Sequence, residues 1–162
     1  LDVLLESIDA ACLSTRLRII LAGRLGPEVF HQAKSRPELI QYLGLLPRQE
    51  ARSWAEACEI CLVIQNRSTI SRDTIPSKLY EYSSYGASVL FLGYQNREVA
   101  ENAEAMRYYH ADQSNPIQVA QTLKRLLDTP AEQRLKMLPI TVERAVESLC
   151  GLFSRVLTEK RP

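Results

Sequence analysis

The segment Thr74–Gly93, TIPSKLYEYSSYGASVLFLG, joins a short helical pattern to a run of apolar or small residues. Pro76 suits the first turn of a helix, so the pattern predicts a helix from Pro76 to about Tyr85, with Gly86 at its carboxyl end. The run Ser88–Gly93 then predicts a strand. A helix that leads directly into such a strand is typical of an α/β fold.

The same alternation of helical and apolar segments continues along the chain, with no internal repeat or low-complexity linker. Leu17–Gly23 (LRIILAG) is too continuously apolar for a half-exposed strand, which favours the centre of a parallel sheet. Further strands are predicted at Leu39–Gly44, Ile60–Gln65 and Arg107–Ala111, and further helices at Leu1–Leu13, Pro27–Lys34, Pro47–Cys58, Arg97–Met106, Asn115–Asp128 and Glu143–Leu157. The predicted fold is one α/β domain over residues 1–162, a doubly wound, Rossmann-like parallel sheet of about five or six strands.

Composition excludes several classes of partner. The 20 basic and 19 acidic residues leave a formal charge of +1, so we expect no nucleic-acid partner and no bulk attraction to a membrane. No apolar run approaches the ~18 residues of a spanning helix, and we expect a cytoplasmic protein. Cys58 and Cys61 have the spacing of a metal-binding pair, but no second pair accompanies them. We therefore predict no metal site and a buried, apolar Cys61.

Ligands of open α/β sheets bind beyond the carboxyl ends of the strands, so the loops that follow the strands are the candidate site. The first two such loops begin GRLG at Gly23 and GLLPRQE at Gly44. Their glycines permit close approach of the backbone to a ligand, although GRLG lacks the spacing of a dinucleotide-binding motif.

The third loop, NRSTISRDTIPSK, ends at the predicted helix start. Backbone N–H groups near Ser77, the positive end of the helix dipole and Lys78 together favour an anion there. Asp73 and Glu81, eight positions apart, can both face a ligand over this helix start. The alternative is that Asp73 is an ordinary loop acid and that Glu81 is a solvated helix residue paired with Lys78.

Three stretches of the chain resemble the carboxyl-terminal, donor-binding half of GT-B glycosyltransferases of the group 1 (family 4) kind. They are LRIILAG, the segment Ile40–Gln65 and, most specifically, IPSKLYEYSSYGASVLFLG, and the similarity runs from about Leu17 to Leu127. The resemblance implies transfer of a sugar from a nucleotide sugar to an acceptor in polysaccharide or glycan biosynthesis. The donor would be linked to UDP, GDP or ADP, and neither a cofactor nor a metal is implied.

The resemblance also implies roles for single residues. Glu81 would contact the ribose, and Asp73, which replaces the more usual glutamate, would lie near the donor sugar as the catalytic residue. The remaining residues expected in the nucleotide-sugar site are Gly23 and Arg24 in the first loop, Gly44, Leu45 and Leu46 beside the base, Thr74, Ile75 and Ser77 at the diphosphate, and the cation Lys78.

Enzymes of this kind have a second Rossmann-like half that binds the acceptor, and we expect this chain to be an isolated donor domain without activity of its own. A full-length enzyme could then work at the inner face of the membrane. Two other functions stay open from the sequence: the corresponding half of a GT-B nucleotide-sugar epimerase, and a flavodoxin-like nucleotide-binding module without catalysis.

Overall fold

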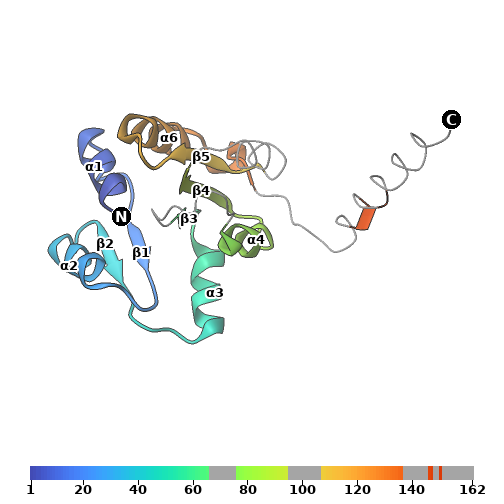
Figure 1. Cartoon of the computed structure of the whole chain (residues 1–162), viewed down its shortest axis with the longest axis horizontal. Helices are drawn as coiled ribbons and strands as arrows, with labels where there is room; N and C mark the ends of the chain where they lie inside the picture. Colours follow the sequence, from blue (N-terminus) through green and yellow to red (C-terminus); the bar gives the residue numbers. More distant parts are fainter. Residues whose placement is uncertain (66–75, 95–106, 137–145, 148–149, 151–162) are drawn as a thin grey trace.

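Strand β4 (Ser88–Gly93) is the middle strand of a parallel sheet, and all six of its residues are buried. It pairs with β3 (Ile60–Ile64) on one side and with β5 (Tyr109–Asp112) on the other (Figure 1). The computed structural model describes residues 1–65, 76–94, 107–136, 146–147 and 150. Its other elements are α1 (Asp2–Ala10), β1 (Ile19–Leu21), α2 (Pro27–Ser35), β2 (Ile40–Tyr42), α3 (Arg48–Ala57), α4 (Ser77–Ser83), α6 (Pro116–Asp128) and the 3₁₀ turn η2 (Ala131–Gln133).

Side chains of β4 point alternately into two apolar clusters. Leu90 and Leu92 belong to a cluster with residues of α1 and α6, whereas Val89 and Phe91 pack with Leu79 of α4. Because successive residues of a strand face opposite sides of its sheet, helices cover both faces of this one. The arrangement is the doubly wound pattern that the sequence predicts.

A second parallel pair, β1 with β2, shares the first of these clusters. Ile19 of β1 and Ile40 of β2 are buried in the same cluster as Leu90, and Leu62 of β3 packs against it. The predicted α/β fold class with parallel strands is therefore confirmed. The five described strands form hydrogen-bonded sets of two and three, and side chains of the common core join these sets.

The first strand is shorter than the predicted Leu17–Gly23. Only Ile19–Leu21 has strand geometry, and Gly23 has φ +104°, which takes the chain out of the extended region. A strand of three residues has few backbone groups to offer a further neighbour. Burial of Ile19, rather than a long hydrogen-bond ladder, therefore holds β1 in the fold.

Helices α1 and α6 pack against each other beside the three-stranded sheet (Figure 1). The Ser7 hydroxyl joins them, because it lies 2.6 Å from the Val3 carbonyl oxygen and 3.1 Å from that of Pro116. The predicted cap of α6 is confirmed: the Asn115 side-chain oxygen accepts a hydrogen bond from the Gln118 backbone N–H at 3.1 Å.

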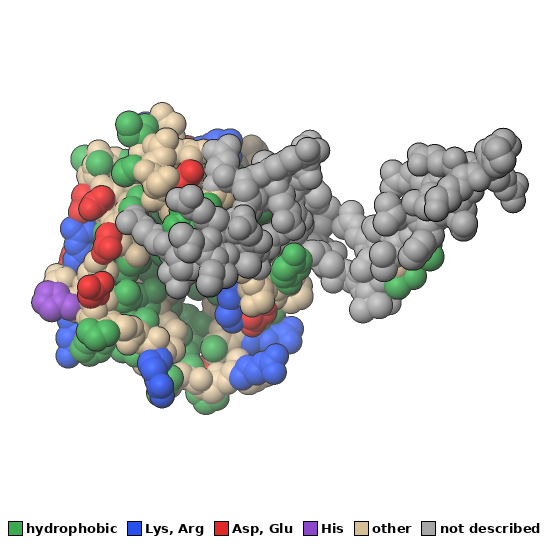
Figure 2. Space-filling model, viewed as in Figure 1, with side chains coloured by type: hydrophobic (Ala, Val, Ile, Leu, Met, Phe, Trp, Pro, Cys, Tyr) green, Lys and Arg blue, Asp and Glu red, His purple; other side chains and the backbone are tan. Residues whose placement is uncertain are grey.

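Two predicted helices cannot be compared in full. The segment Arg97–Met106 lies outside the described residues, and of 143–157 only residues 146, 147 and 150 are described, all three of them helical. Within the described ranges, no helix has both the length and the apolar character needed to cross a bilayer. On the face shown in Figure 2, acidic and basic side chains are interspersed, in keeping with the nearly neutral chain.

Helix α4 ends at Ser83 with Ser84 as its cap, so Gly86 lies in the turn beyond the helix rather than at its carboxyl end, where the sequence predicted it. The turn from α4 into β4 depends on Gly86, which has φ +59° and open space where a Cβ would lie. We expect Gly86→Ala to lower the free energy of unfolding by about 1 kcal/mol, because a left-handed backbone is strained for alanine. Gly86→Asn is the matched control, because asparagine adopts the left-handed region far more readily than alanine and the space around Gly86 is open. Its loss should be clearly smaller than that of Gly86→Ala. Urea unfolding measures both, and equal losses would contradict this account of Gly86.

Candidate functional site

Two of the predicted loops meet at the carboxyl ends of β1 and β2. The Gly23 backbone N–H donates a hydrogen bond of 2.7 Å to the Gly44 carbonyl oxygen, and the Tyr42 hydroxyl donates one of 2.8 Å to the Gly23 carbonyl oxygen. Gly44 has φ +74°, so both turns rely on a glycine in the left-handed region. The structure thus brings these two loops, which begin 21 positions apart in sequence, into one hydrogen-bonded unit.

This unit presents both charge and apolar surface. Arg24 is exposed, Leu46 is half-buried, and Leu45 is 73% exposed at the turn. The exposed Leu45 side chain beside the left-handed Gly44 can cover a flat apolar group of a ligand, as single exposed leucines on a surface can.

The third predicted loop lies largely outside the described residues. Asp73, Thr74 and Ile75 belong to the range 66–75, so their predicted roles stay predictions. Pro76 is the first described residue after this range and directly precedes α4. Ser77 and Lys78, the first two residues of α4, are exposed. Leu79 is fully buried and fixes this short helix on the sheet.

Glu81 makes the ion pair that the sequence left open as an alternative. Lys78 Nζ lies 2.6 Å from Glu81 Oε2, and the Tyr85 hydroxyl donates a hydrogen bond of 3.1 Å to Glu81 Oε1. The hydrogen bond from Lys78 lowers the pKa of Glu81 most, the Tyr85 hydroxyl adds to this effect, and partial desolvation opposes it. Each carboxylate oxygen keeps a further lone pair, so Glu81 can still accept hydrogen bonds from a ligand.

Helix α3 links the two parts of the candidate site. Arg48, its first residue, follows the Leu46–Pro47 turn and contributes electrostatically to the lowered pKa of Glu81. One turn later, Arg52 pairs with Glu56 at 2.7 Å and lies over the Tyr85 ring at 5.4 Å. The positive charges of α3 therefore stand near the carboxylate on α4.

Sequence reasoning missed a polar group at the carboxyl ends of β3, β4 and β5. Gln65 directly follows β3 and Gln113 directly follows β5, and they are only 5% and 4% exposed. Gln65 Oε1 accepts a hydrogen bond of 2.9 Å from the Tyr94 backbone N–H. It also lies over Gly93, where a Cβ would come within 2.7 Å of this oxygen. The available signal was a glutamine at the end of one predicted strand, Gln65, and another two residues after a second predicted strand, Gln113.

The cysteine prediction is confirmed for Cys61. This side chain of β3 is buried in one cluster with residues of β4 and α4, and burial raises the pKa of its thiol to about 11. Among the described residues, no three His, Cys, Asp or Glu side chains are grouped closely enough to hold a metal ion.

Comparisons with known proteins place the fold. No protein-family model matches the chain, and no curated protein matches it in sequence. The chain is similar to the crystal structure of AviGT4, a glycosyltransferase involved in avilamycin A biosynthesis, with a TM-score of 0.50 and 17% sequence identity. The match covers 78% of this chain and 39% of that one, so this chain spans less than half of the length of AviGT4. The chain thus has a glycosyltransferase-like α/β fold, consistent with one Rossmann-like half of a GT-B enzyme.

Proposed function

We propose that this chain is the donor-binding half of a glycosyltransferase that moves a sugar from a nucleotide sugar to an acceptor, in polysaccharide or glycan assembly. The observation that carries the proposal is the alignment of its parallel α/β fold with AviGT4 over 78% of the chain. The resemblance of IPSKLYEYSSYGASVLFLG to the donor-binding half of such enzymes supports this half rather than the acceptor-binding one.

In this proposal the nucleoside lies between the glycine turns and α4. Leu45 and the Gly44 turn provide the surface for the base, and Glu81 accepts hydrogen bonds from the ribose hydroxyls. Arg48 and Lys78 supply positive potential on this side of the molecule, where an anionic diphosphate would lie.

The chemistry is displacement at the anomeric carbon of the donor sugar. The bond from this carbon to the diphosphate oxygen breaks, the acceptor hydroxyl oxygen forms the new bond and gives its proton to the departing phosphate oxygen, and the nucleoside diphosphate leaves with the electron pair. Lys78 and the backbone N–H of Ser77 would stabilise the charge that develops on the leaving phosphate, with Thr74 and Ile75 amides adding to them. Asp73 would lie beside the sugar, and a separate acceptor-binding half would supply the second substrate.

Binding of a nucleoside diphosphate should not require a divalent cation, because cationic side chains and backbone N–H groups take the place of a metal in this proposal. Calorimetric titration of the chain with UDP, GDP and ADP, with and without a chelator, measures this. We expect at least one of the three to bind weakly and equally well in both conditions. Loss of binding on chelation would refute the metal-free site.

Glu81→Ala should weaken nucleoside diphosphate binding about ten- to a hundredfold, because hydrogen bonds from two ribose hydroxyls to a carboxylate are lost. The free energy of unfolding should change by no more than about 0.5 kcal/mol, since the ion pair with Lys78 is solvent-exposed. Calorimetry and urea unfolding measure the two effects.

Asp128→Ala is the matched control for this variant. The Asp128 side chain is 50% exposed and that of Glu81 is 42% exposed, and each is ion-paired on a surface helix, with Arg16 and Lys78 respectively. A general effect of removing a surface carboxylate would appear in both variants. If both bind every nucleoside diphosphate as tightly as the parent, Glu81 is only a solvated partner of Lys78.

The 162-residue chain by itself should transfer no sugar, because positioning of the acceptor depends on groups outside it. Incubation with nucleotide sugars and a panel of acceptors, with release of nucleoside diphosphate as the readout, tests this. Turnover onto an added acceptor would show that the chain is a self-sufficient enzyme and would overturn its assignment as a donor half.

A further inference from the structure

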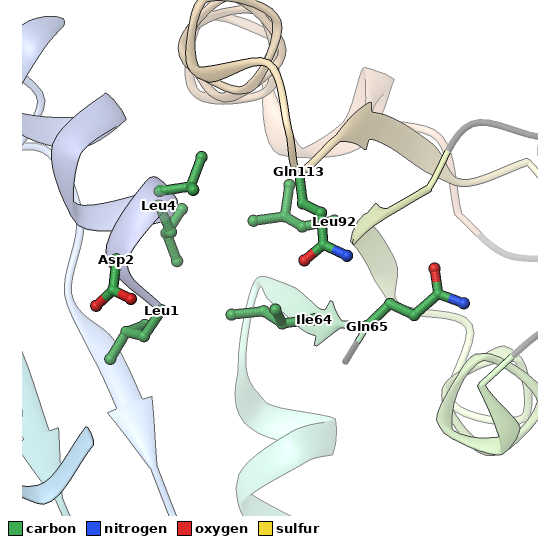
Figure 3. Close-up of a pocket in the computed structure, with 8 residues that line it drawn as sticks. Leu1, Asp2, Leu4, Ile64, Gln65, Leu92 and Gln113 are labelled. Atoms are coloured by element: carbon green, nitrogen blue, oxygen red, sulfur yellow. The ribbon is translucent and has the colours of Figure 1, made fainter. Parts of the chain in front are cut away.

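A pocket of about 230 Å³ lies at the carboxyl ends of β3 and β4 (Figure 3). No Lys or Arg is among the described residues that line it, and its volume is below the roughly 300–1,000 Å³ of sites for complete small molecules. An anionic ligand such as a nucleoside diphosphate therefore finds its charged partners elsewhere. They lie on α3 and α4, around the Glu81 carboxylate.

Tyr85 completes the contacts of this carboxylate. Lys78 Nζ lies 2.6 Å from Glu81 Oε2, and the Tyr85 hydroxyl donates a hydrogen bond of 3.1 Å to Glu81 Oε1. Tyr85 lies beyond the last residue of α4, but its backbone N–H donates to the Tyr82 carbonyl oxygen at 3.1 Å, which continues the turn. The side chain therefore stays on the same face as Glu81, four positions earlier. Each carboxylate oxygen has a donor of its own, so the two donors hold the group from both sides.

The Tyr85 ring is itself held by groups on two elements. The Arg52 guanidinium of α3 lies 5.4 Å from the ring centroid, and Arg52 is paired with Glu56 at 2.7 Å. The Tyr82 ring lies 6.0 Å away, and Tyr82 packs against the apolar cluster of β3, β4 and α4. None of these contacts involves the Tyr85 hydroxyl. Tyr85→Phe therefore removes the hydrogen bond to Glu81 and leaves the ring in place.

A glutamate on a helix surface is a flexible side chain, and its mobility opposes binding. Immobilising such a side chain when a ligand binds raises the dissociation constant by about two- to tenfold. The hydrogen bonds from Lys78 and Tyr85 restrict the Glu81 carboxylate before a ligand arrives. The Glu81 side chain is still 42% exposed, so its remaining lone pairs can be reached from solvent.

We propose that Tyr85 is a positioning residue for Glu81: its hydroxyl fixes the carboxylate so that both oxygens can accept hydrogen bonds from the ribose hydroxyls. The inference rests on the proposed function, which supplies the ribose. Lys78 restrains the other carboxylate oxygen, but its charge would also attract the phosphates. The Tyr85 hydroxyl is neutral and touches no ligand in this proposal, so it acts on binding only through Glu81.

The first test is calorimetric titration of the parent chain and of Tyr85→Phe with UDP, GDP and ADP. Each nucleotide that binds the parent should bind Tyr85→Phe about three- to tenfold more weakly, because the carboxylate must then be ordered on binding. Tyr80→Phe is the matched control, since it removes the hydroxyl of a tyrosine that is 44% exposed on the same helix. It should bind as the parent does. Unchanged binding by Tyr85→Phe, or equal weakening in both variants, would overturn the proposal.

Two further titrations separate positioning from a direct contact between the Tyr85 hydroxyl and the ligand. The 2′,3′-dideoxy counterpart of the nucleotide offers Glu81 no ribose hydroxyl, so the parent and Tyr85→Phe should bind it equally. In a Glu81→Ala background, adding Tyr85→Phe should not weaken binding of the ribonucleotide, since the carboxylate to be positioned is gone. A further loss in either titration would show that Tyr85 touches the ligand, and would overturn the positioning role.

The hydrogen bond also has a spectroscopic readout, the carboxyl ¹³C signal of Glu81, which is assigned by its absence from Glu81→Ala. The Lys78 hydrogen bond lowers the pKa of Glu81 most, desolvation opposes it, and the Tyr85 hydroxyl lowers it further. Tyr85→Phe should therefore move the titration midpoint to higher pH, whereas Tyr80→Phe should leave it unchanged. An unmoved midpoint in Tyr85→Phe would show that the hydroxyl does not hold the carboxylate, and the proposal would fail.

Failure of the proposed function has a different signature. If UDP, GDP and ADP all fail to bind the parent chain, the donor-binding assignment is wrong, and the positioning role falls with it. If a nucleotide binds the parent and Glu81→Ala weakens it while Tyr85→Phe does not, the donor-binding half stands and only the role of Tyr85 is wrong.

Discussion

Burial of β4 on both faces is the constraint on which the rest of the structure depends. Its six residues are buried, and its side chains alternate between two clusters. Burying a large apolar side chain stabilises the fold by roughly 1.5–3 kcal/mol relative to exposure, so Leu90, Phe91 and Leu92 all require cover. Helices α1 and α6 cover one face and α4 covers the other, which leaves the ends of the strands as the place where polar chemistry can lie.

Because apolar side chains cover both faces of the sheet, polar side chains gather at the carboxyl ends of its strands. Backbone groups there pass from a ladder into loops and need new partners. Gln65 satisfies the Tyr94 N–H, and the Gly93 carbonyl oxygen accepts from the Gln113 N–H. These contacts hold two glutamine side chains at the end of the sheet, one of which retains an unsatisfied amide.

The electrostatic potential in the candidate site comes from a few nearby charged side chains. The chain carries almost no net charge, so a general attraction for anions is absent and any anion must be held by nearby groups. Lys78 on α4 and Arg48 on α3 act on the Glu81 carboxylate, and they come from segments that the fold brings together through β3 and β4. A carboxylate kept ionised beside cations is compatible with both a structural pair and a ribose contact, which is why the Asp128 comparison is informative.

Local pattern was sufficient for much of the fold. The apolar runs that became β3 and β4, the Asn115 cap and the left-handed Gly86 all follow from interactions within a few residues, and they could be predicted from the sequence. The extent of β1 could not be predicted in this way, because burial against α1 and β4 holds β1 in place although its own hydrogen-bond ladder is short.

The same division holds for the candidate site. The residue types and the glycines were visible in the sequence. Only the folded chain creates the hydrogen bond between Gly23 and Gly44 and the contacts of Glu81 with Lys78 and Tyr85. The same is true of the burial that leaves Gln113 Nε2 without a hydrogen-bond partner in the described part of the chain. The sequence by itself determined which segments must be buried, because apolar periodicity is a local property. Only the tertiary structure decided which polar groups meet at the ends of the strands, because that depends on how the buried segments pack.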